Sequence, residues 1–265
     1  MNISAWLDHA IKQLREIGVD SARLDAELIL ANTLRKNRTY LHAHPEDDID
    51  PRRVDIANAR LRLRLERVPL AYILGYRDFY GRRFTVSPQV LVPRPESEAI
   101  IELLKELGVS GKLLDIGTGS GCLGITAKLE IPKLNVFLSD ISQPALRVAR
   151  QNAEKFQADV ALIKSNLLRA VPGKFDIIIA NLPYVDRSWQ RSPETNHEPT
   201  LALFAKDEGL ALIYQLIDQL PVHLNPGALI FLEADPRQHG AIIAYAGSRQ
   251  LQHKLTRGFI VVLQA

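Results

Sequence analysis

Four short apolar runs recur in the middle of the chain and alternate with segments of helical periodicity. The runs cover residues 112–116, 135–139, 160–163 and 175–180. Runs of this length and composition are typical of strands buried inside a parallel sheet. Residues 122–129 and 144–156 have the apolar spacing of helices that cover such a sheet. The pattern predicts an α/β fold in which strands and helices alternate.

The first 75 residues show only helical patterns. One apolar stripe consists of Trp6, Ala10, Leu14 and Ile17. Gly18 is placed to end that helix, and residues 22–34 predict a second one. A third is expected over residues 51–67, where the apolar residues between arginines are Val54, Ile56, Leu61, Leu63 and Leu65. We therefore expect a small all-helical domain over residues 1–75.

A change of pattern separates this helical part from the rest of the chain. Residues 76–93 contain short alternating runs around Gly81 and Pro88, which predict a hairpin linker. The α/β domain is then expected over residues 94–265.

Composition is that of an ordinary globular enzyme. The 265 residues are 46% hydrophobic and include one cysteine, Cys122, which excludes an intramolecular disulfide. Cys122 begins an apolar helix and is expected to be a small core residue rather than a nucleophile. His42 and His44 complete no recognised zinc pattern, so no metal is expected. Without a secretory leader or a long apolar segment, the expected location is the cytoplasm.

The net charge of +3 is unevenly distributed. Nine arginines gather in one stretch: Arg52, Arg53, Arg60, Arg62, Arg64, Arg67, Arg77, Arg82 and Arg83. Only Asp55, Glu66 and Asp78 oppose them. Such a stretch can steer an enzyme to an acidic protein or to RNA, and a solvated helix face is the alternative explanation. Because the aromatic residues of a single-strand nucleic-acid groove are largely absent, a protein partner is favoured.

The tetrapeptide Asn181-Leu182-Pro183-Tyr184 directly follows the apolar run 175–180. Open α/β sheets place their chemistry where such strands end. An Asn side-chain oxygen beside a backbone carbonyl, with an aromatic ring nearby, supplies acceptors in the plane of an NH2 group. The tetrapeptide predicts methylation of an amide or an exocyclic amine, and an ordinary strand-ending turn is the alternative.

A glycine-rich loop follows the first apolar run. It consists of Gly117, Thr118, Gly119, Ser120 and Gly121. In dinucleotide folds such a loop presents N–H groups to a pyrophosphate, but the third glycine of that motif is missing here. Asp115, just before the loop, is a poor neighbour for a phosphate and a good one for a cationic or amino-bearing ligand. S-adenosylmethionine fits that preference, while a tight turn without a ligand is the alternative.

Two further strand ends carry polar candidates. Asp140 lies about twenty residues beyond the glycine loop, the distance at which an acidic residue accepts hydrogen bonds from ribose hydroxyls. Ser142 is the better candidate for capping the next helix. Asn166 is placed to bond an adenine amine, with Leu167 packed on the ring, although a turn-forming Asn is equally consistent.

The order of these elements resembles that of class I methyltransferases, which use S-adenosylmethionine on a Rossmann-like domain. Residues 91–98, Leu-Val-Pro-Arg-Pro-Glu-Ser-Glu, are similar to the PRPETE segment of the protein-(glutamine-N5) methyltransferase family, which modifies peptide chain release factors. Further segments that resemble this family, in the same order, are residues 67–75, 198–203, 207–210 and 231–233. The resemblance covers essentially the whole chain.

This resemblance implies methyl transfer to the side-chain amide nitrogen of the glutamine in the Gly-Gly-Gln motif of release factors. In the family, that amide bonds the Asn side chain and the carbonyl of the following residue, which here are Asn181 and Leu182. Tyr184 is then expected to wall the pocket. Glu198 would lie on a loop over the site and Glu233 at a strand end, each with either a functional or a structural role. The helical domain would dock the substrate.

One position departs from the family pattern. Leu182 replaces the first proline of the usual Asn-Pro-Pro-Tyr, although its carbonyl is retained and Pro183 favours an extended backbone before it. Asn-Leu-Pro-Tyr is also typical of ribosomal RNA adenine dimethyltransferases. Three alternatives therefore remain: N6-adenine methylation of RNA or DNA, glutamine methylation of a ribosomal protein, and a non-catalytic S-adenosylmethionine-binding module.

Overall fold

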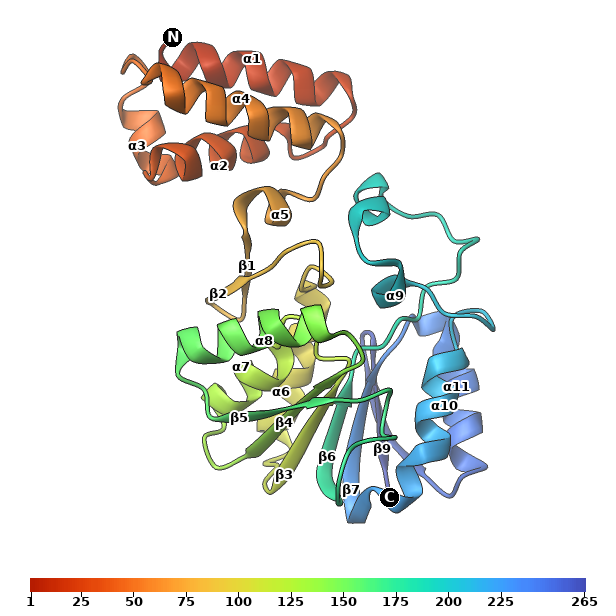
Figure 1. Cartoon of the computed structure of the whole chain (residues 1–265). Coiled ribbons are helices and arrows are strands. Elements are labelled where there is room, and N and C mark those ends of the chain that lie inside the picture. Colours follow the sequence, from red (N-terminus) through yellow and green to blue (C-terminus); the bar gives the residue numbers. More distant parts are fainter. The chain divides into compact units, whose positions relative to one another are not determined.

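The computed structural model describes residues 1–265, which form two compact units (Figure 1). The smaller unit comprises Met1–Gly75 and the short segment Ser192–His197. The larger unit comprises Tyr76–Arg191 and Glu198–Ala265. The loop that follows the tetrapeptide therefore contributes a few residues to the smaller unit.

Helices build the smaller unit. They are α1 (Ile3–Glu16), α2 (Ala22–Leu34), α3 (Arg38–Ala43), α4 (Pro51–Leu65) and α5 (Leu70–Leu74). Asn2 and Asn37 cap α1 and α3 with their side chains, and Asp50 caps α4 directly before Pro51. The predicted range of α2 is confirmed. The helices α3 and α5 were not predicted, since each is too short to display a periodicity.

The core of this unit differs in part from the predicted apolar stripes. Trp6 is fully buried, and its indole Nε1 donates to Asn58 Oδ1 at 2.8 Å. Ile17 is 41% exposed because α1 ends one residue before it. Ile56 and Leu63 are each 43% exposed, because α4 turns other positions toward the core. The buried residues of α4 are Ala57, Leu61 and Arg64.

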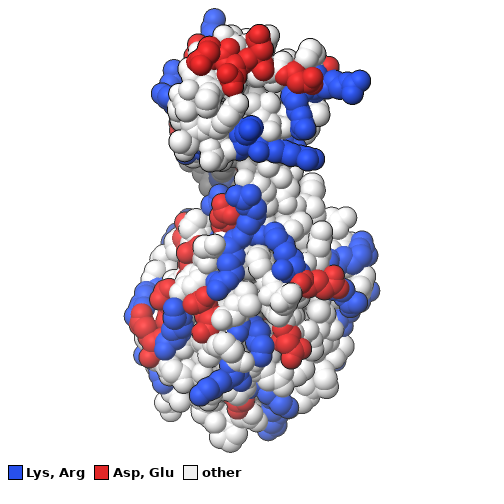
Figure 2. All heavy atoms as spheres, turned by 90° about the vertical axis from the view of Figure 1, so that its left-hand side faces the viewer, with Lys and Arg blue, Asp and Glu red and all other residues white.

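Several residues of the arginine-rich stretch are engaged inside their own unit. Arg64 is 5% exposed and donates from Nε to Asp25 Oδ2 at 2.6 Å. Arg53 donates to the carbonyl of Thr33 and Arg60 to its hydroxyl. The arginines of the stretch that are classed as exposed are Arg52, Arg62, Arg77 and Arg83. Because only these four of the nine arginines are exposed, the number of arginines in the sequence overstates the basic surface. On the face drawn in Figure 2, basic and acidic side chains of the larger unit are interspersed.

The larger unit is built on a seven-stranded sheet with the order β5-β4-β3-β6-β7-β9-β8. Its parallel strands are β3 (Lys112–Ile116), β4 (Asn135–Asp140), β5 (Val160–Lys164), β6 (Phe175–Ala180) and β7 (Leu224–Glu233). The antiparallel edge is formed by β8 (Gln252–Arg257) and β9 (Ile260–Gln264). The predicted α/β fold is confirmed, and this mixed sheet has the class I methyltransferase topology. All four predicted strands are present, but β5 is an edge strand without a fully buried residue, in contrast to the expectation that all four are buried.

Helices cover both faces of the sheet. On one face lie α6 (Glu98–Glu106), α7 (Cys122–Glu130) and α8 (Gln143–Phe156), and on the other α10 (Ala211–Gln219) and α11 (His239–Gly247) (Figure 1). Strand β6 serves both cores, because Ile177 and Ile179 face the first set of helices while Ile178 and Ala180 face the second.

Short elements complete the larger unit. Strands β1 (Tyr76–Phe79) and β2 (Arg82–Thr85) form an antiparallel hairpin, and Gly81 takes a φ of +71° at its turn. The remaining helix is α9 (Thr200–Leu203), and the 3₁₀ turns are η1 (Pro95–Ser97), η3 (Leu220–Val222) and η4 (Pro236–Gln238). The turn η2 (Pro193–His197) belongs to the smaller unit. No helix combines the length and apolar character needed to cross a membrane.

Candidate active site

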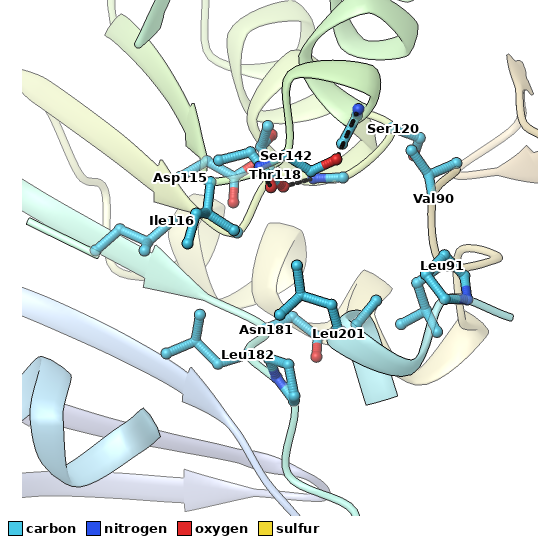
Figure 3. Close-up of a pocket in the computed structure, with 18 of the residues that line it drawn as sticks. Val90, Leu91, Asp115, Ile116, Thr118, Ser120, Ser142, Asn181, Leu182 and Leu201 are labelled. Atoms are coloured by element: carbon cyan, nitrogen blue, oxygen red, sulfur yellow. Dashed lines mark hydrogen bonds between the residues drawn. The ribbon is translucent and has the colours of Figure 1, made fainter. Parts of the chain in front are cut away.

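A pocket opens at the carboxyl ends of β3, β4 and β6. Here the strand order reverses, because the chain runs outward from β3 to β4 and β5 and then crosses back to β6 on the other side of β3. Open α/β sheets bind ligands at such a switch point. In Figure 3, Asp115 and Thr118 lie on one side of the pocket, and Asn181 and Leu182 on the other. The sequence-predicted residues that line it are Asp115, Gly117, Thr118, Gly119, Ser120, Asp140, Asn166, Leu167, Asn181, Leu182 and Pro183.

The glycines of the loop adopt backbone angles that other residues rarely take. Gly117 has a φ of +70° and Gly119 of +54°. A Cβ on Gly117 would also lie 3.1 Å from Leu182 Cδ2, so the loop and the tetrapeptide approach closely. Gly121, with a φ of +81°, does not line the pocket but begins α7, where a Cβ would lie 2.7 Å from Ile125 Cδ1. Its requirement for glycine thus comes from its backbone conformation and from packing rather than from contact with a ligand.

Asp115 is a buried carboxylate at the base of the loop, 1% exposed. Its Oδ2 accepts from the hydroxyl of Thr118 at 2.6 Å and from the N–H of Gly124 at 3.0 Å. Burial raises the pKa of Asp115 to about 6, although these two hydrogen bonds oppose the shift. A cationic ligand beside this carboxylate would stabilise its charged form.

Asp140 ties the glycine loop to the next helix. Its Oδ2 accepts from the N–H of Gly119 at 2.9 Å, and its Oδ1 from the N–H of Ser142 at 2.8 Å. Burial raises the pKa of Asp140, against these backbone bonds. The N–H of Ile141 is a third backbone donor. Since a carboxylate can accept about four hydrogen bonds, acceptor capacity remains for a ligand. Ser142 caps α8 by accepting from the N–H of Ala145, which confirms its predicted capping role.

Asn166 and Leu167 follow β5 and also line the pocket. Leu167 has a φ of +51°, a left-handed backbone that is uncommon for a residue with a branched side chain. Its side chain is nevertheless 7% exposed and packs in the core. Strained backbone of this kind concentrates at ligand sites, because surrounding structure must maintain it.

Three residues of the tetrapeptide, Asn181, Leu182 and Pro183, line the pocket. The side-chain Nδ2 of Asn181 donates to Ser97 Oγ at 3.1 Å. Leu182 lines the pocket as well, but it is only 5% exposed and packs with the core residues of β3 and β6.

Tyr184 does not lie among the residues that line the pocket, in contrast to the expectation that it walls it. Its hydroxyl instead donates to Glu233 Oε1 at 3.3 Å, and burial raises the pKa of the phenol. The backbone carbonyl of Tyr184 accepts from Gln238 Nε2 at 2.9 Å. These contacts direct the ring toward the end of β7.

Two polar pairs near the pocket were not recognised as pairs from sequence. Ser97 Oγ donates to Glu233 Oε2 at 2.5 Å, and both residues are 1% exposed. Arg94 donates to Glu198 Oε2 at 2.5 Å, where burial raises the pKa of Glu198 and Arg94 opposes the shift. Arg94 and Ser97 lie in residues 91–98, the segment that resembles PRPETE. This resemblance was the sequence signal that could have identified them as functional residues.

Cys122 differs from the expected core residue. It is partly exposed and lines the pocket. Burial raises the pKa of its thiol to about 12, so the thiolate that a nucleophile requires is scarce at neutral pH.

Two family profiles match the chain. The profile described as the PrmC N-terminal domain matches residues 5–75, and that of the methyltransferase small domain matches residues 95–198.

Curated relatives align along nearly the whole chain. A release factor glutamine methyltransferase of Koribacter versatilis is 40% identical in an alignment of length 253 that covers 89% of this chain and 89% of the relative. A release factor glutamine methyltransferase of Deinococcus radiodurans is 36% identical in an alignment of length 250 that covers 92% of this chain and 90% of the relative.

Solved structures share the fold of the larger unit. The 16S rRNA N2 G1207 methyltransferase of Thermus thermophilus, in complex with AdoMet and guanosine, matches with a TM-score of 0.53 and 20% identity. The match covers 72% of this chain and 49% of that chain. At this identity the likeness concerns the fold alone.

Proposed function

Because the chain belongs to the release factor glutamine methyltransferase family, we propose that it methylates the glutamine side-chain amide (N5) in the Gly-Gly-Gln motif of release factors, using S-adenosylmethionine. One observation supports this most directly. Asn181 and Leu182 border the pocket at the end of β6, opposite the glycine loop (Figure 3).

The chemistry of the pocket fits S-adenosylmethionine. Asp115 and Asp140 make the glycine loop unfavourable for a phosphate and favourable for amino, sulfonium and ribose groups. We assign the remaining acceptor sites of Asp140 to the ribose hydroxyls, and Asn166 with Leu167 to the adenine. The bound cofactor supplies a methyl group made electrophilic by its sulfonium.

The substrate amide is assigned to the opposite side of the pocket. Asn181 Oδ1 and the Leu182 carbonyl would each accept one N–H of the glutamine side chain. Two acceptors in the plane of the NH2 group fix the direction in which the nitrogen lone pair points. Every residue type has this backbone carbonyl, so leucine at position 182 is compatible with the role.

Alignment is the main requirement of the reaction. An amide nitrogen is a weak nucleophile because its lone pair is delocalised into the carbonyl. As that conjugation weakens during transfer, positive charge develops on the nitrogen and the two acceptors stabilise it. Well-aligned reactants can lower a barrier by roughly 7–11 kcal/mol, so no strong general base is needed. The surplus proton leaves to a carbonyl or to water after the methyl group has transferred.

We further propose that the smaller unit docks the release factor. It matches the PrmC N-terminal domain profile and carries exposed Arg52 and Arg62 on α4. Exposed basic groups raise the association rate with an acidic partner. Charge reversal at both positions should raise KM for the release factor several-fold and leave the affinity for S-adenosylmethionine unchanged. An unchanged KM would remove these arginines from the docking surface.

The proposed activity is tested with a labelled methyl donor. Label should enter a purified release factor and should not enter a variant in which alanine replaces the motif glutamine. Parallel reactions contain ribosomal RNA or ribosomal proteins. Label found only in RNA would establish adenine chemistry instead, and label found in no substrate despite tight cofactor binding would indicate a binding module.

A further inference from the structure

Three side chains from distant parts of the chain form one hydrogen-bonded series that begins at the pocket wall. Asn181 Nδ2 donates to Ser97 Oγ at 3.1 Å, and Ser97 Oγ donates to Glu233 Oε2 at 2.5 Å. Ser97 and Glu233 are each 1% exposed and lie 136 positions apart in the sequence. Asn181 and Ser97 both line the pocket, whereas Glu233 does not.

The carboxylate sets the direction of every bond in the series. Burial raises the pKa of Glu233, while the hydrogen bonds from Ser97 and Tyr184 favour its ionised form. An ionised carboxylate only accepts hydrogen bonds, so Ser97 directs its single hydroxyl proton to Glu233. The lone pairs of Ser97 are then the only groups it can offer to Asn181, and they require a donor. The NH2 group of Asn181 therefore faces Ser97. Tyr184, which donates to the other carboxylate oxygen, adds a second donor to the same acceptor.

The opposite orientation of the Asn181 amide is disfavoured. A flipped amide would place Oδ1 against the Ser97 oxygen, where two acceptors would face each other. It would also place NH2 donors in the pocket, where the N–H groups of the substrate amide need acceptors.

We propose that Ser97 and Glu233 are positioning residues that hold the Asn181 amide with Oδ1 toward the substrate. This inference rests on the proposed function, since it assigns to these residues the orientation of the group that aligns the glutamine amide. Hydrogen bonds in series also polarise one another, so the bond to Ser97 increases the acceptor strength of Asn181 Oδ1.

The test compares Ser97→Ala with Ser97→Thr, because threonine keeps the hydroxyl. Ser97→Ala should lower kcat on the release factor about 10- to 100-fold, the range expected for loss of a buried hydrogen bond, and change KM little. Ser97→Thr should restore most of this activity. Ser139→Ala is the matched control, because that hydroxyl is also 1% exposed but donates to the backbone carbonyl of Asp115 at 3.4 Å. It should leave kcat unchanged.

Glu233→Gln examines the acceptor end of the series. The amide replaces one of the two carboxylate oxygens with an NH2 donor, and Ser97 and Tyr184 donate to different oxygens, so one of them loses its acceptor. We expect a loss of kcat at least as large as that of Ser97→Ala, with S-adenosylmethionine affinity within about twofold as evidence of a folded pocket. If Glu233→Gln fails to fold, the alanine and threonine variants of Ser97 still decide the question.

A second readout does not depend on catalysis. Hydrogen exchange of the Asn181 side-chain amide, followed by ¹⁵N NMR in the full chain, should be slow in the wild type and in Ser97→Thr and faster in Ser97→Ala. Equal exchange in all three, or equal kcat in the wild type and Ser97→Ala, would overturn the positioning role. A wild type that methylates only RNA would instead refute the proposed function, and the same variants would then be compared on RNA.

Discussion

The two units differ in the groups that donate hydrogen bonds to their buried carboxylates. In the smaller unit, Glu27 is 1% exposed and binds Arg38 at 2.5 Å. Burial alone would raise its pKa, but hydrogen bonds from Arg23 and Arg38 lower it. In the larger unit, Asp115 accepts from a hydroxyl and a backbone N–H, and burial raises its pKa to about 6.

The comparison distinguishes buried carboxylates that stabilise the fold through ion pairs from buried carboxylates that are available to bind a ligand. A guanidinium partner compensates the desolvation of a buried carboxylate, whereas neutral donors compensate only part of it. Groups with raised pKa values that gather at one pocket are characteristic of functional sites. We therefore expect substitutions of charged pairs in the smaller unit to change stability, and substitutions around the pocket to change binding and turnover.

The largest effect is expected from the buried ion pair of the smaller unit. Arg64→Leu leaves Asp25 buried without its partner and should lower the free energy of unfolding by about 3–5 kcal/mol, measured by urea denaturation. The double variant with Asp25→Leu should recover much of the loss, and the exposed Arg62→Leu should change stability by less than about 0.5 kcal/mol. A loss below about 1 kcal/mol for Arg64→Leu would contradict the structural role of the pair.

Asn181→Ala should act on turnover instead of stability. Removal of an acceptor that faces developing charge should lower kcat by about 100- to 1000-fold, while the affinity for S-adenosylmethionine changes modestly. Single-turnover kinetics and calorimetry separate these two quantities. Near-normal turnover of a folded variant would contradict the amide-alignment mechanism.

Asp140→Ala should weaken S-adenosylmethionine binding by roughly 1–3 kcal/mol, because it removes a charged acceptor from the pocket. Calorimetric titration measures the change, with Asp140→Asn as a variant of the same shape and the exposed Asp159→Ala as a control. Unchanged affinity in folded Asp140→Ala would exclude this carboxylate from the cofactor site.

The raised pKa of Asp115 predicts opposite pH dependences for binding and stability. Lowering the pH from 7 to 5 protonates Asp115, and loss of its charge should weaken S-adenosylmethionine binding by up to about tenfold. Because its pKa is higher in the folded than in the unfolded chain, the same protonation stabilises the ligand-free protein between pH 6 and about pH 4. Asp115→Asn should abolish both dependences. Affinity that is constant across this range would refute the role of the Asp115 charge.

Leu182→Pro should have the smallest effect on turnover. Both residues present the same carbonyl to the pocket, so kcat at saturating substrate should stay within about threefold of the wild type. A change of substrate from RNA to protein in this variant would instead show that the leucine selects adenine.

Local sequence patterns were sufficient for the elements that have strong periodicity. The ranges of α2, β3 and β6 agree with the predicted ones, because buried strands and amphipathic helices leave their spacing in the sequence. The glycine loop and the tetrapeptide could be placed at strand ends for the same reason. Parallel strands then bring these ends to one edge of the sheet, which explains why the residues share a pocket.

Tertiary packing alone decided which side chains face one another. Ser97 and Tyr184 both donate hydrogen bonds to Glu233. Tyr184 follows β6 and Glu233 ends β7, and these two strands are neighbours in the sheet. Arg64 looked like a surface arginine, yet its position on α4 faces the core and the carboxylate of Asp25. Such pairings depend on residues far apart in the chain, so neither spacing nor composition reveals them. The sequence by itself determined the strands, the loop and the candidate chemistry, and the folded chain determined which charges are paired and which remain for a ligand.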